Sequence, residues 1–313
     1  MRWLVLFLWC GFAFAQGYPS KPVKLVTPFP PGGSADVIAR LTAQRLAENF
    51  GQPVVVDNRG GAGGLVGTEY AAKQPPDGYT LVLITGAYPV QAAMLKSMPF
   101  DPLTDVAMVS LLTSYPFVIS VRADSPFRSL GDLIAAAKAN PGKLNYPSSG
   151  IGTVHHLSGE LLNAMAGIDI THVPFRGGAS PLTEVLGGRV DLLLEAMTLS
   201  IGQIQSGKLR ALAVTSRERW KALPNVPTVA ETVPDYEVNS FIGLGASGGT
   251  PREIVERLNA EVRKALANPD MRQRLIDLGG EPGASSPDEM KGFIAREIAK
   301  WREVIALRKI ERQ

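Results

Sequence analysis

Short runs of apolar and β-branched residues alternate along the chain with longer segments in which apolar residues recur at helical spacing. In the first third, this pattern predicts strands at 23–27, 53–57 and 80–85 and helices at 36–50 and 65–73. Strands that alternate with helices form a mostly parallel sheet covered by helices, with ligand sites beyond the carboxyl ends of the strands. The predicted fold class is therefore α/β.

The same alternation returns after the apolar run at 117–121. It predicts a second sheet, with strands at 143–146, 170–173, 190–194 and 209–215 and helices at 130–140, 153–165, 182–186 and 200–205. From Val238 the chain leaves this unit. We expect a return strand at 241–246 and then helical segments at 251–267, 269–278 and 287–307.

Two extended segments, near 118–122 and 238–244, are expected to cross between the two units. They would place residues 18–120 and 241–313 in one domain and residues 121–240 in the other. Two crossings make a hinge, because a few residues at strand ends can absorb the rotation that closes two domains on a ligand. The sequence thus predicts two βα domains joined by two crossover strands, with a ligand cleft between them.

The N-terminus has the layout of a cleavable secretory signal at 1–15, with Arg2, an apolar run at 3–14 and a final Ala-Phe-Ala. The run is too short to cross a bilayer, which takes roughly 20 apolar residues. Cys10, the only cysteine, lies inside this segment, so the exported chain would hold no disulfide and no cysteine-based site. Lipid attachment at Cys10 is an alternative, opposed by the bulky Trp9 before it.

Charge is nearly balanced, with 32 Lys and Arg against 29 Asp and Glu and a formal net charge of +3. The two signs are mixed along the chain, as on a solvated surface. Nucleic-acid binding would need a concentrated basic patch with aromatic stacking platforms. We therefore expect no nucleic-acid partner.

The first strand is followed by a proline and glycine turn, PFPPGGSAD, at 28–36. Gly32 and Gly33 would let backbone approach a ligand without Cβ interference, or would serve only a tight turn. The helix then opens on Ser34, Ala35 and Asp36, with Ser34 expected as its N-cap. Because the first N–H groups of a helix have no partner within it, they attract negative charge. The turn predicts anion binding rather than bond making.

A second turn of the same kind, SSGIGT, lies at 148–153 between a predicted strand and helix. Two such turns, one from each domain, would present N–H donors and the positive ends of helix dipoles to the same cleft. Charge-assisted bonds to such donors are about twice as strong as neutral ones, so a small pocket could hold a dianion without many arginines.

The order and spacing of several blocks resemble the extracytoplasmic solute receptors of the tripartite tricarboxylate transporter family, also known as the Bug family. The resemblance covers nearly the whole chain after the signal. The blocks are PFPPGGSAD at 28–36, VDNRGGAGG at 56–64, DGYT at 77–80, SSGIGT at 148–153, VPFRGG at 173–178, GKLRALAV at 207–214 and LPNVPTVAE at 223–231.

This resemblance implies a periplasmic binding protein of the type II-like, two-crossover kind that captures a small carboxylate and presents it to membrane permease subunits. It implies neither catalysis nor a cofactor, and we expect a monomer. One ligand carboxylate would be held by backbone amides of 29–36 and the other by 148–153 of the second domain, partly through bridging waters. Di- and tricarboxylates, acidic amino acids and aromatic acids all remain open as ligands.

Further candidate residues follow the first-domain strands. Phe29 is expected as a pocket wall against the ligand's carbon chain, or as simple core. Thr85, Gly86 and Ala87, at the end of the third strand, are also expected as wall residues, although family members look richer in Ser or Thr there. Asp36 has three possible roles: a helix-dipole partner, an organiser of the loop, or a contact to a ligand amine or water.

In the second domain, the candidate ligand contacts are Ser148, Ser149, Gly152 and Thr153, and Thr153 could also cap its helix. Arg176 could hold a carboxylate bidentately, or form a surface or interdomain ion pair. Glu195, after a predicted strand, is expected to hold a ligand amine, a water or the guanidinium of Arg176.

Other chemistries find little support. His155 and His156 diverge by about 100° on a helix, and His172 is the only other histidine, so we expect no metal site. The glycines at 60–64 lack the context of a dinucleotide fingerprint, and none of the three histidines has an evident serine and acid partner arrangement. A sensory receptor that presents the same ligand class to a signalling partner remains the alternative function, and a secreted enzyme acting on a small acid is a third.

Overall fold

The computed structural model describes residues 17–176, 179–307 and 310–313. The predicted signal peptide and Cys10 lie outside these residues. The first lobe is built on three parallel strands, β1 (Val23–Thr27), β2 (Val54–Asn58) and β3 (Thr80–Thr85). Its sheet continues antiparallel through β9 (Asn239–Ser247), β4 (Val106–Arg122) and the short β10 (Glu281–Pro282).

Helices cover this sheet because apolar residues on one side of each helix pack against the buried strands. Those of the first lobe are α1 (Ser34–Phe50), η1 (Ala62–Gly64), α2 (Leu65–Ala72), α3 (Ala87–Met94), α8 (Arg252–Ala267), α9 (Pro269–Asp277) and α10 (Pro287–Leu307). Leu25, Leu83 and Leu258 are fully buried in the core between them. No helix among the described residues is long and apolar enough to span a membrane.

The second lobe has two groups of strands. β5 (Asn145–Ser148) and β6 (Thr171–Pro174) pair in parallel, whereas β7 (Leu193–Ala196) and β8 (Leu209–Val214) pair antiparallel with the end of β4. The helical elements of this lobe are α4 (Leu130–Ala139), α5 (Val154–Ala166), α6 (Ser180–Leu186), α7 (Met197–Gln205) and η2 (Val229–Glu231).

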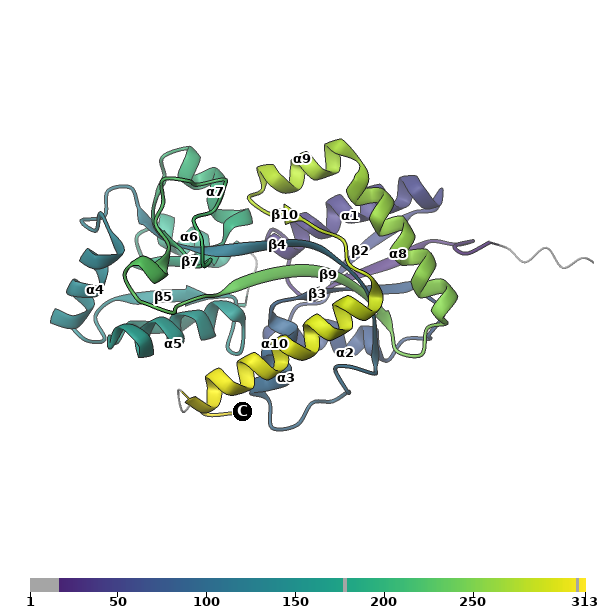
Figure 1. Ribbon diagram of the computed structural model, residues 1–313, viewed down its shortest axis with the longest axis horizontal. Coiled ribbons are helices and arrows are strands. Elements are labelled where there is room, and N and C mark those ends of the chain that lie inside the picture. The colour runs from purple at the N-terminus through teal and green to yellow at the C-terminus, as the bar shows by residue number, and fades with distance from the viewer. Residues whose placement is uncertain (1–16, 177–178, 308–309) are drawn as a thin grey trace, which may run out of the picture.

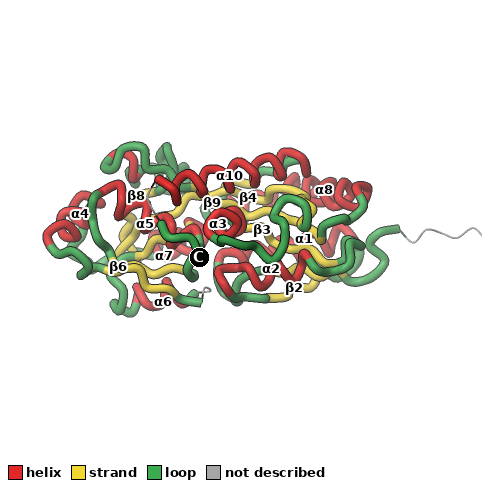
Figure 2. Tube along the Cα trace, turned by 90° about the horizontal axis from the view of Figure 1, so that it is seen from below, coloured by secondary structure: helices red, strands yellow, loops and turns green. Residues whose placement is uncertain are grey.

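Strand β4 passes from one lobe to the other, and β9 returns beside it (Figure 1). β4 pairs with β9 from Val106 to Pro116 and then with β7 and β8 from Phe117 onward. The chain that leads into β9 is held at the same place, because Val238 N–H donates to the Thr215 carbonyl at 2.9 Å. Two adjacent crossover strands therefore join the lobes, while the domain bounds 18–120 with 241–313 and 121–240 remain a prediction. Figure 2 shows α5, α6 and α7 on one side of this junction and α1, α2 and α3 on the other.

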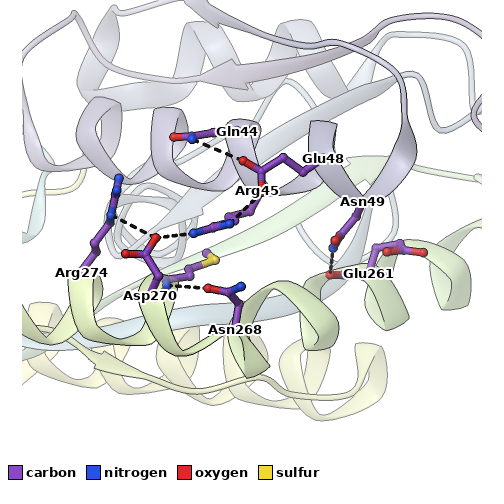
Figure 3. A network of polar contacts seen from close by, with 9 residues as sticks. Gln44, Arg45, Glu48, Asn49, Glu261, Asn268, Asp270 and Arg274 are labelled. Atoms are coloured by element: carbon purple, nitrogen blue, oxygen red, sulfur yellow. Dashed lines mark hydrogen bonds and ion pairs between the residues drawn. The ribbon is translucent and has the colours of Figure 1, made fainter.

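Polar contacts fix α1 to the helices behind it (Figure 3). Arg45 donates to Glu48 at 2.7 Å and forms an ion pair with Asp270 of α9. Asn49 Nδ2 donates to the main-chain carbonyl of Glu261 in α8 at 3.2 Å. These contacts hold the C-terminal half of α1, so the position of its N-terminus, which opens on the cleft, is set by the first lobe.

Five details differ from the sequence-based expectations. Helix α3 was not predicted, because every residue from Ala87 to Met94 is buried and no amphipathic period is visible. The first half of β4 was also missed. Helix α7 begins at Met197 rather than 200, and Glu195 lies inside β7 rather than after a strand. The predicted second sheet is divided, since β5 and β6 pair apart from β7 and β8.

Candidate functional site

A cleft lies between the two lobes, beyond the carboxyl ends of the first-lobe strands. It encloses about 520 Å³ of space, part of it open to solvent. Residues from both lobes and from the crossover strands line it. They are Phe29, Gly33, Ser34, Ala35, Thr85, Gly86, Ala87, Tyr115, Phe117, Ser149, Thr153, Val154, His155, Glu195, Ala196, Leu199 and Ser240. This lining contains no lysine or arginine among the described residues.

The N-termini of four helices, α1, α3, α5 and α7, open on this cleft, because residues at or next to each helix start belong to the lining. Each start carries N–H groups with no partner inside its helix and the positive end of the helix dipole. Such a convergence creates a site of positive potential without a cationic side chain, which is suited to a small anion.

The start of α1 carries several donors without a described partner. Its N-cap is Gly33, which has no side chain to cap the helix, so the expectation that Ser34 is the N-cap was wrong. Ser34 is instead the first helical residue, and its buried Oγ has no hydrogen-bond partner among the described residues. The N–H groups of Ser34, Ala35 and Asp36 likewise donate to no described acceptor.

Asp36 stabilises this loop from the side away from the cleft. Its carboxylate accepts hydrogen bonds from Gly32 N at 3.0 Å, from Arg40 at 3.0 Å and from Asn58 Nδ2 at 2.9 Å. Burial alone would raise the pKa of Asp36, but these three donors outweigh it and hold the pKa below its ordinary value. Because the carboxylate is occupied in this way and does not line the cleft, the geometry favours the role of loop organiser among the three that the sequence left open.

The second-lobe loop at 148–153 uses most of its donors internally. Thr153 caps α5, accepting from His156 N at 3.4 Å and donating to the Gly150 carbonyl at 2.7 Å. Gly152 N donates to His156 Nδ1 at 3.3 Å, and Gly150 N donates to Ser148 Oγ at 3.1 Å. In the first turn of α5, the N–H groups of Val154 and His155 have no described acceptor.

Two histidines, His156 and His172, pack against this loop. The rings of His156 and His172 stack with centroids 4.2 Å apart, and His172 Nε2 lies 2.6 Å from Ser148 Oγ. Burial lowers the pKa of His156. Burial, together with the neighbouring His156, lowers the pKa of His172 to about 4. Both rings are therefore neutral near pH 7, and they stack without repulsion.

Glu195 and His155 form a pair in the second-lobe wall. His155 Nε2 lies 2.8 Å from Glu195 Oε1, which also accepts from Ala196 N at 2.8 Å. The His155 ring packs edge-on against Phe117, with centroids 4.8 Å apart. Of the three partners expected for Glu195, the Arg176 guanidinium is contradicted, because Arg176 is exposed and no ion pair joins it to the described residues. A ligand amine or a water as partner stays a prediction.

The crossover strands form the remaining wall. Tyr115 of β4 and Ser240 of β9 lie opposite each other in the strand register and both line the cleft. Burial raises the pKa of the Tyr115 phenol, so it stays protonated and neutral. Gly86 packs so closely on this wall that a Cβ would lie 2.6 Å from Ser240 Oγ and 2.8 Å from Val154 Cγ2.

The lobes touch at the rim of the cleft. Gln91 Nε2 of α3 donates to the Gly152 carbonyl of the second-lobe loop at 3.1 Å, in a buried position. Gly63 of η1 lies beside this bond, with φ +64°. A Cβ at Gly63 would lie 2.2 Å from Gln91 Nε2 and 2.9 Å from the Ile151 carbonyl oxygen. The structure thus has the lobes in contact around the cleft.

Most of the predicted contact residues lie in the lining. Those placed there are Phe29, Gly33, Ser34, Ala35, Gly86, Ala87, Ser149, Thr153 and Glu195. The others lie behind or beside it, and they are Gly32, Asp36, Ser148, Gly152 and Arg176. Sequence reasoning missed Tyr115, Phe117, Leu199 and Ser240 as site residues. Leu199 could have been found had the start of α7 been placed correctly, since the N-termini of the other helices were the guiding signal.

The fold and the cleft define a periplasmic binding protein: two α/β lobes, two crossover strands and an anion-suited cleft between them. Residues 38–310 match the family described as "Tripartite tricarboxylate transporter family receptor". The protein BugT of Bordetella pertussis is 37% identical over 294 residues, which cover 93% of this chain and 90% of BugT. The chain belongs to this family of solute receptors, as its sequence blocks indicated.

Solved structures agree with this assignment. The R. palustris protein Rpa4515, determined with adipate, has a TM-score of 0.90 and 40% identity, covering 94% of this chain and 99% of that chain. MatC from Rhodopseudomonas palustris, with bound malate, has a TM-score of 0.87 and 32% identity, covering 92% of this chain and 100% of its own. These family members are solute-binding proteins rather than enzymes.

Proposed function

We propose that this protein is a periplasmic receptor that captures a small carboxylate and delivers it to the membrane subunits of a tripartite tricarboxylate transporter. The observation that carries the proposal is the convergence of helix N-termini on a cleft whose lining, among the described residues, has no lysine or arginine. Adipate in Rpa4515 and malate in MatC are both carboxylates, which supports the same ligand class here.

In this proposal the start of α1 grips one carboxylate. Ser34 Oγ and the N–H groups of Ser34 and Ala35 supply the donors, and Phe29 and Phe117 contact the carbon chain. The α5 start reaches the rest of the ligand through the N–H groups of Val154 and His155, partly through bridging waters. The receptor acts as a monomer after export by the 1–15 signal peptide.

Mass spectrometry under native conditions tests the ligand class, with protein exported to the periplasm and purified without refolding. We expect a co-purified carboxylic acid that is released unchanged and rebinds in calorimetry. Release of a chemically altered molecule would support an enzyme instead. Co-purification of a ligand without a carboxylate would contradict the proposal.

Delivery to a permease is distinguished from sensing by an uptake assay. Deletion of the receptor gene should abolish uptake of the identified acid into cells, and the wild-type gene should restore it. The sensory alternative predicts unchanged uptake together with a lost transcriptional response to the acid.

A further inference from the structure

Over the part of the chain that the structure describes, the cleft lining contains one carboxylate, that of Glu195, and it lies on the second lobe. The residue is 2% exposed. It lies near the C-terminal end of β7, directly before the N-terminus of α7, where the helix dipole stabilises a negative charge. The start of α1, with its open donors, lies on the other lobe. The first-lobe wall therefore offers donors, whereas the second-lobe wall offers the Glu195 acceptor beside the N–H groups of Val154 and His155.

The two oxygens of Glu195 are used differently. Oε1 is occupied, since His155 Nε2 and Ala196 N both lie 2.8 Å from it. Oε2 accepts no hydrogen bond from any described residue. Because Phe117 packs edge-on against the His155 ring, the ring is held in place and the orientation of the Glu195 carboxylate is fixed with it. The unoccupied Oε2 is thus an oriented acceptor in the wall of the cleft.

An oriented carboxylate in the wall of this cleft discriminates between ligand groups. A second ligand carboxylate beside Glu195 would be repelled, since like charges in a common site oppose each other's ionisation. A methyl group would leave Oε2 without a partner after water is expelled, which is unfavourable for a buried charge. A hydroxyl or ammonium group would donate to it.

We infer that the ligand is a carboxylic acid that carries a hydrogen-bond donor, either a hydroxyl or an ammonium group, at the end that meets Glu195. This inference rests on the proposed function, because the α1 start must hold the ligand's carboxylate. Glu195 is then the residue that determines specificity, and His155 positions it.

Calorimetry with two matched ligand series tests the inference. One series is hexanoate, adipate, 6-hydroxyhexanoate and 6-aminohexanoate, and the other is butyrate, succinate, 4-hydroxybutyrate and 4-aminobutyrate. Within each series only the group opposite the carboxylate changes. In at least one series, we expect the hydroxyl or ammonium compound to bind the wild-type protein about tenfold more tightly than the diacid and the methyl compound.

Glu195→Gln removes the charge and keeps the shape. It should reduce the advantage of the donor-bearing compound over the diacid about tenfold, and it should weaken an ammonium ligand more than a hydroxyl ligand. Glu160→Gln is the matched control, because Glu160 is a carboxylate of the same lobe that accepts from Tyr146 Oη at 2.8 Å and does not line the cleft. The control should leave the ranking unchanged.

Two results would overturn the inference while leaving the proposed function in place. The first is a wild-type preference for the diacid, which needs no variant to be measured. The second is an equal effect of Glu195→Gln on every compound, which would make Glu195 only an anchor for His155. If no acid of either series binds the wild-type protein and no carboxylic acid co-purifies with it, the proposed function fails as well.

Discussion

Each of the two loops at the cleft has a glycine turn followed by the start of a helix, but the two loops use their hydrogen-bond donors differently. The first-lobe loop keeps its donors free, because Gly33 cannot cap α1 and Asp36 holds the loop from the side away from the cleft. The second-lobe loop satisfies most of its donors through Thr153 and His156. The difference underlies our proposal that the first loop binds the ligand directly and that the second closes over it.

The substitution with the largest expected effect lies at the rim of the cleft, and it tests this difference between the two loops. Gly63→Ala would place a Cβ against both Gln91 and Ile151, so the lobes could not reach the closed arrangement. We expect ligand affinity to fall about a hundredfold, since overpacking of this kind typically opposes the packed state by about 1–3 kcal/mol and each 1.4 kcal/mol is a factor of ten. Calorimetry measures the affinity, and small-angle scattering measures whether ligand still closes the lobes.

Gly51→Ala is the matched control for this variant. Gly51 has the same φ of +64°, but no atom lies within 4 Å of the position where its Cβ would be. Any loss of affinity that comes only from placing an alanine in the left-handed region of backbone conformation should therefore appear in both variants. Equal affinities for the two variants would show that contact at the rim does not contribute to binding.

Removing one N–H from each loop compares their donors directly. Proline is tolerated at the first position of a helix when an extended residue precedes it, and both Gly33 and Thr153 are extended. Ser34→Pro should weaken ligand binding at least about tenfold, because it removes a direct bond to a charged group. Val154→Pro should weaken it only about threefold, because water can replace the lost N–H.

Controls for these prolines lie elsewhere on the chain. Arg252→Pro makes the same backbone change at the start of α8, far from the cleft lining, and should leave affinity unchanged. Ser34→Ala keeps the N–H and removes only Oγ, so its effect should be smaller than that of Ser34→Pro. A greater loss from Val154→Pro than from Ser34→Pro would reverse the roles that we assign to the two loops.

As the pH falls, the second-lobe loop should lose stability before the first-lobe loop does. His172 has a folded-state pKa of about 4, against about 6.5 when unfolded, so the unfolded chain binds more protons between these values. Stability is therefore fully present above pH 6.5 and falls as pH decreases toward 4. Asp36, whose pKa is lowered in the fold, keeps its contribution until the pH falls below about 3.9.

The pH dependence of the thermal midpoint measures this difference. His172→Gln should flatten the loss of stability between pH 6.5 and about 4, whereas Asp36→Asn should change the curve only at lower pH. Exchange of backbone amides at 148–153 should rise in the wild-type protein over the same range as the His172 effect. A thermal midpoint that is identical at pH 7 and pH 4.5 in the wild-type protein would contradict the stabilising role that we assign to His172.

The smallest expected effect belongs to Asp36→Asn at neutral pH. An amide can still accept hydrogen bonds from Arg40 and Gly32, so the loop should loosen only partly, and affinity should fall about threefold for every acid tested. Calorimetry on amino and non-amino diacids gives the ranking. A changed ranking would favour the other role considered for Asp36, direct contact with a ligand amine or water.

Much of this organisation was predictable from the sequence because it depends on local signals. Helices α1, α8, α9 and α10 and strands β1, β2 and β3 were expected within a few residues, since their apolar periods are clear. The two cleft loops were found through their glycines and the helix starts after them. Helix α3 was hidden because burial on all sides removes the amphipathic period on which such predictions depend.

The parts that depend on the relative position of the lobes were not predictable. The bond from Gln91 to the Gly152 carbonyl joins residues 61 positions apart, and no local pattern selects that pairing. The pairing of Glu195 with His155 lies within the second lobe and was missed because the two residues are 40 positions apart in the sequence. Arg176 was one of three expected partners, because it is cationic and follows a predicted strand. Side-chain partners that are distant in the sequence follow from tertiary packing rather than from periodicity.

A crystal structure of the protein with its co-purified ligand tests the central claim most directly. The account predicts a ligand carboxylate with oxygens about 3 Å from the N–H groups of Ser34 and Ala35 and from Ser34 Oγ. A ligand held only by the second-lobe loop, with the α1 start facing solvent, would contradict it.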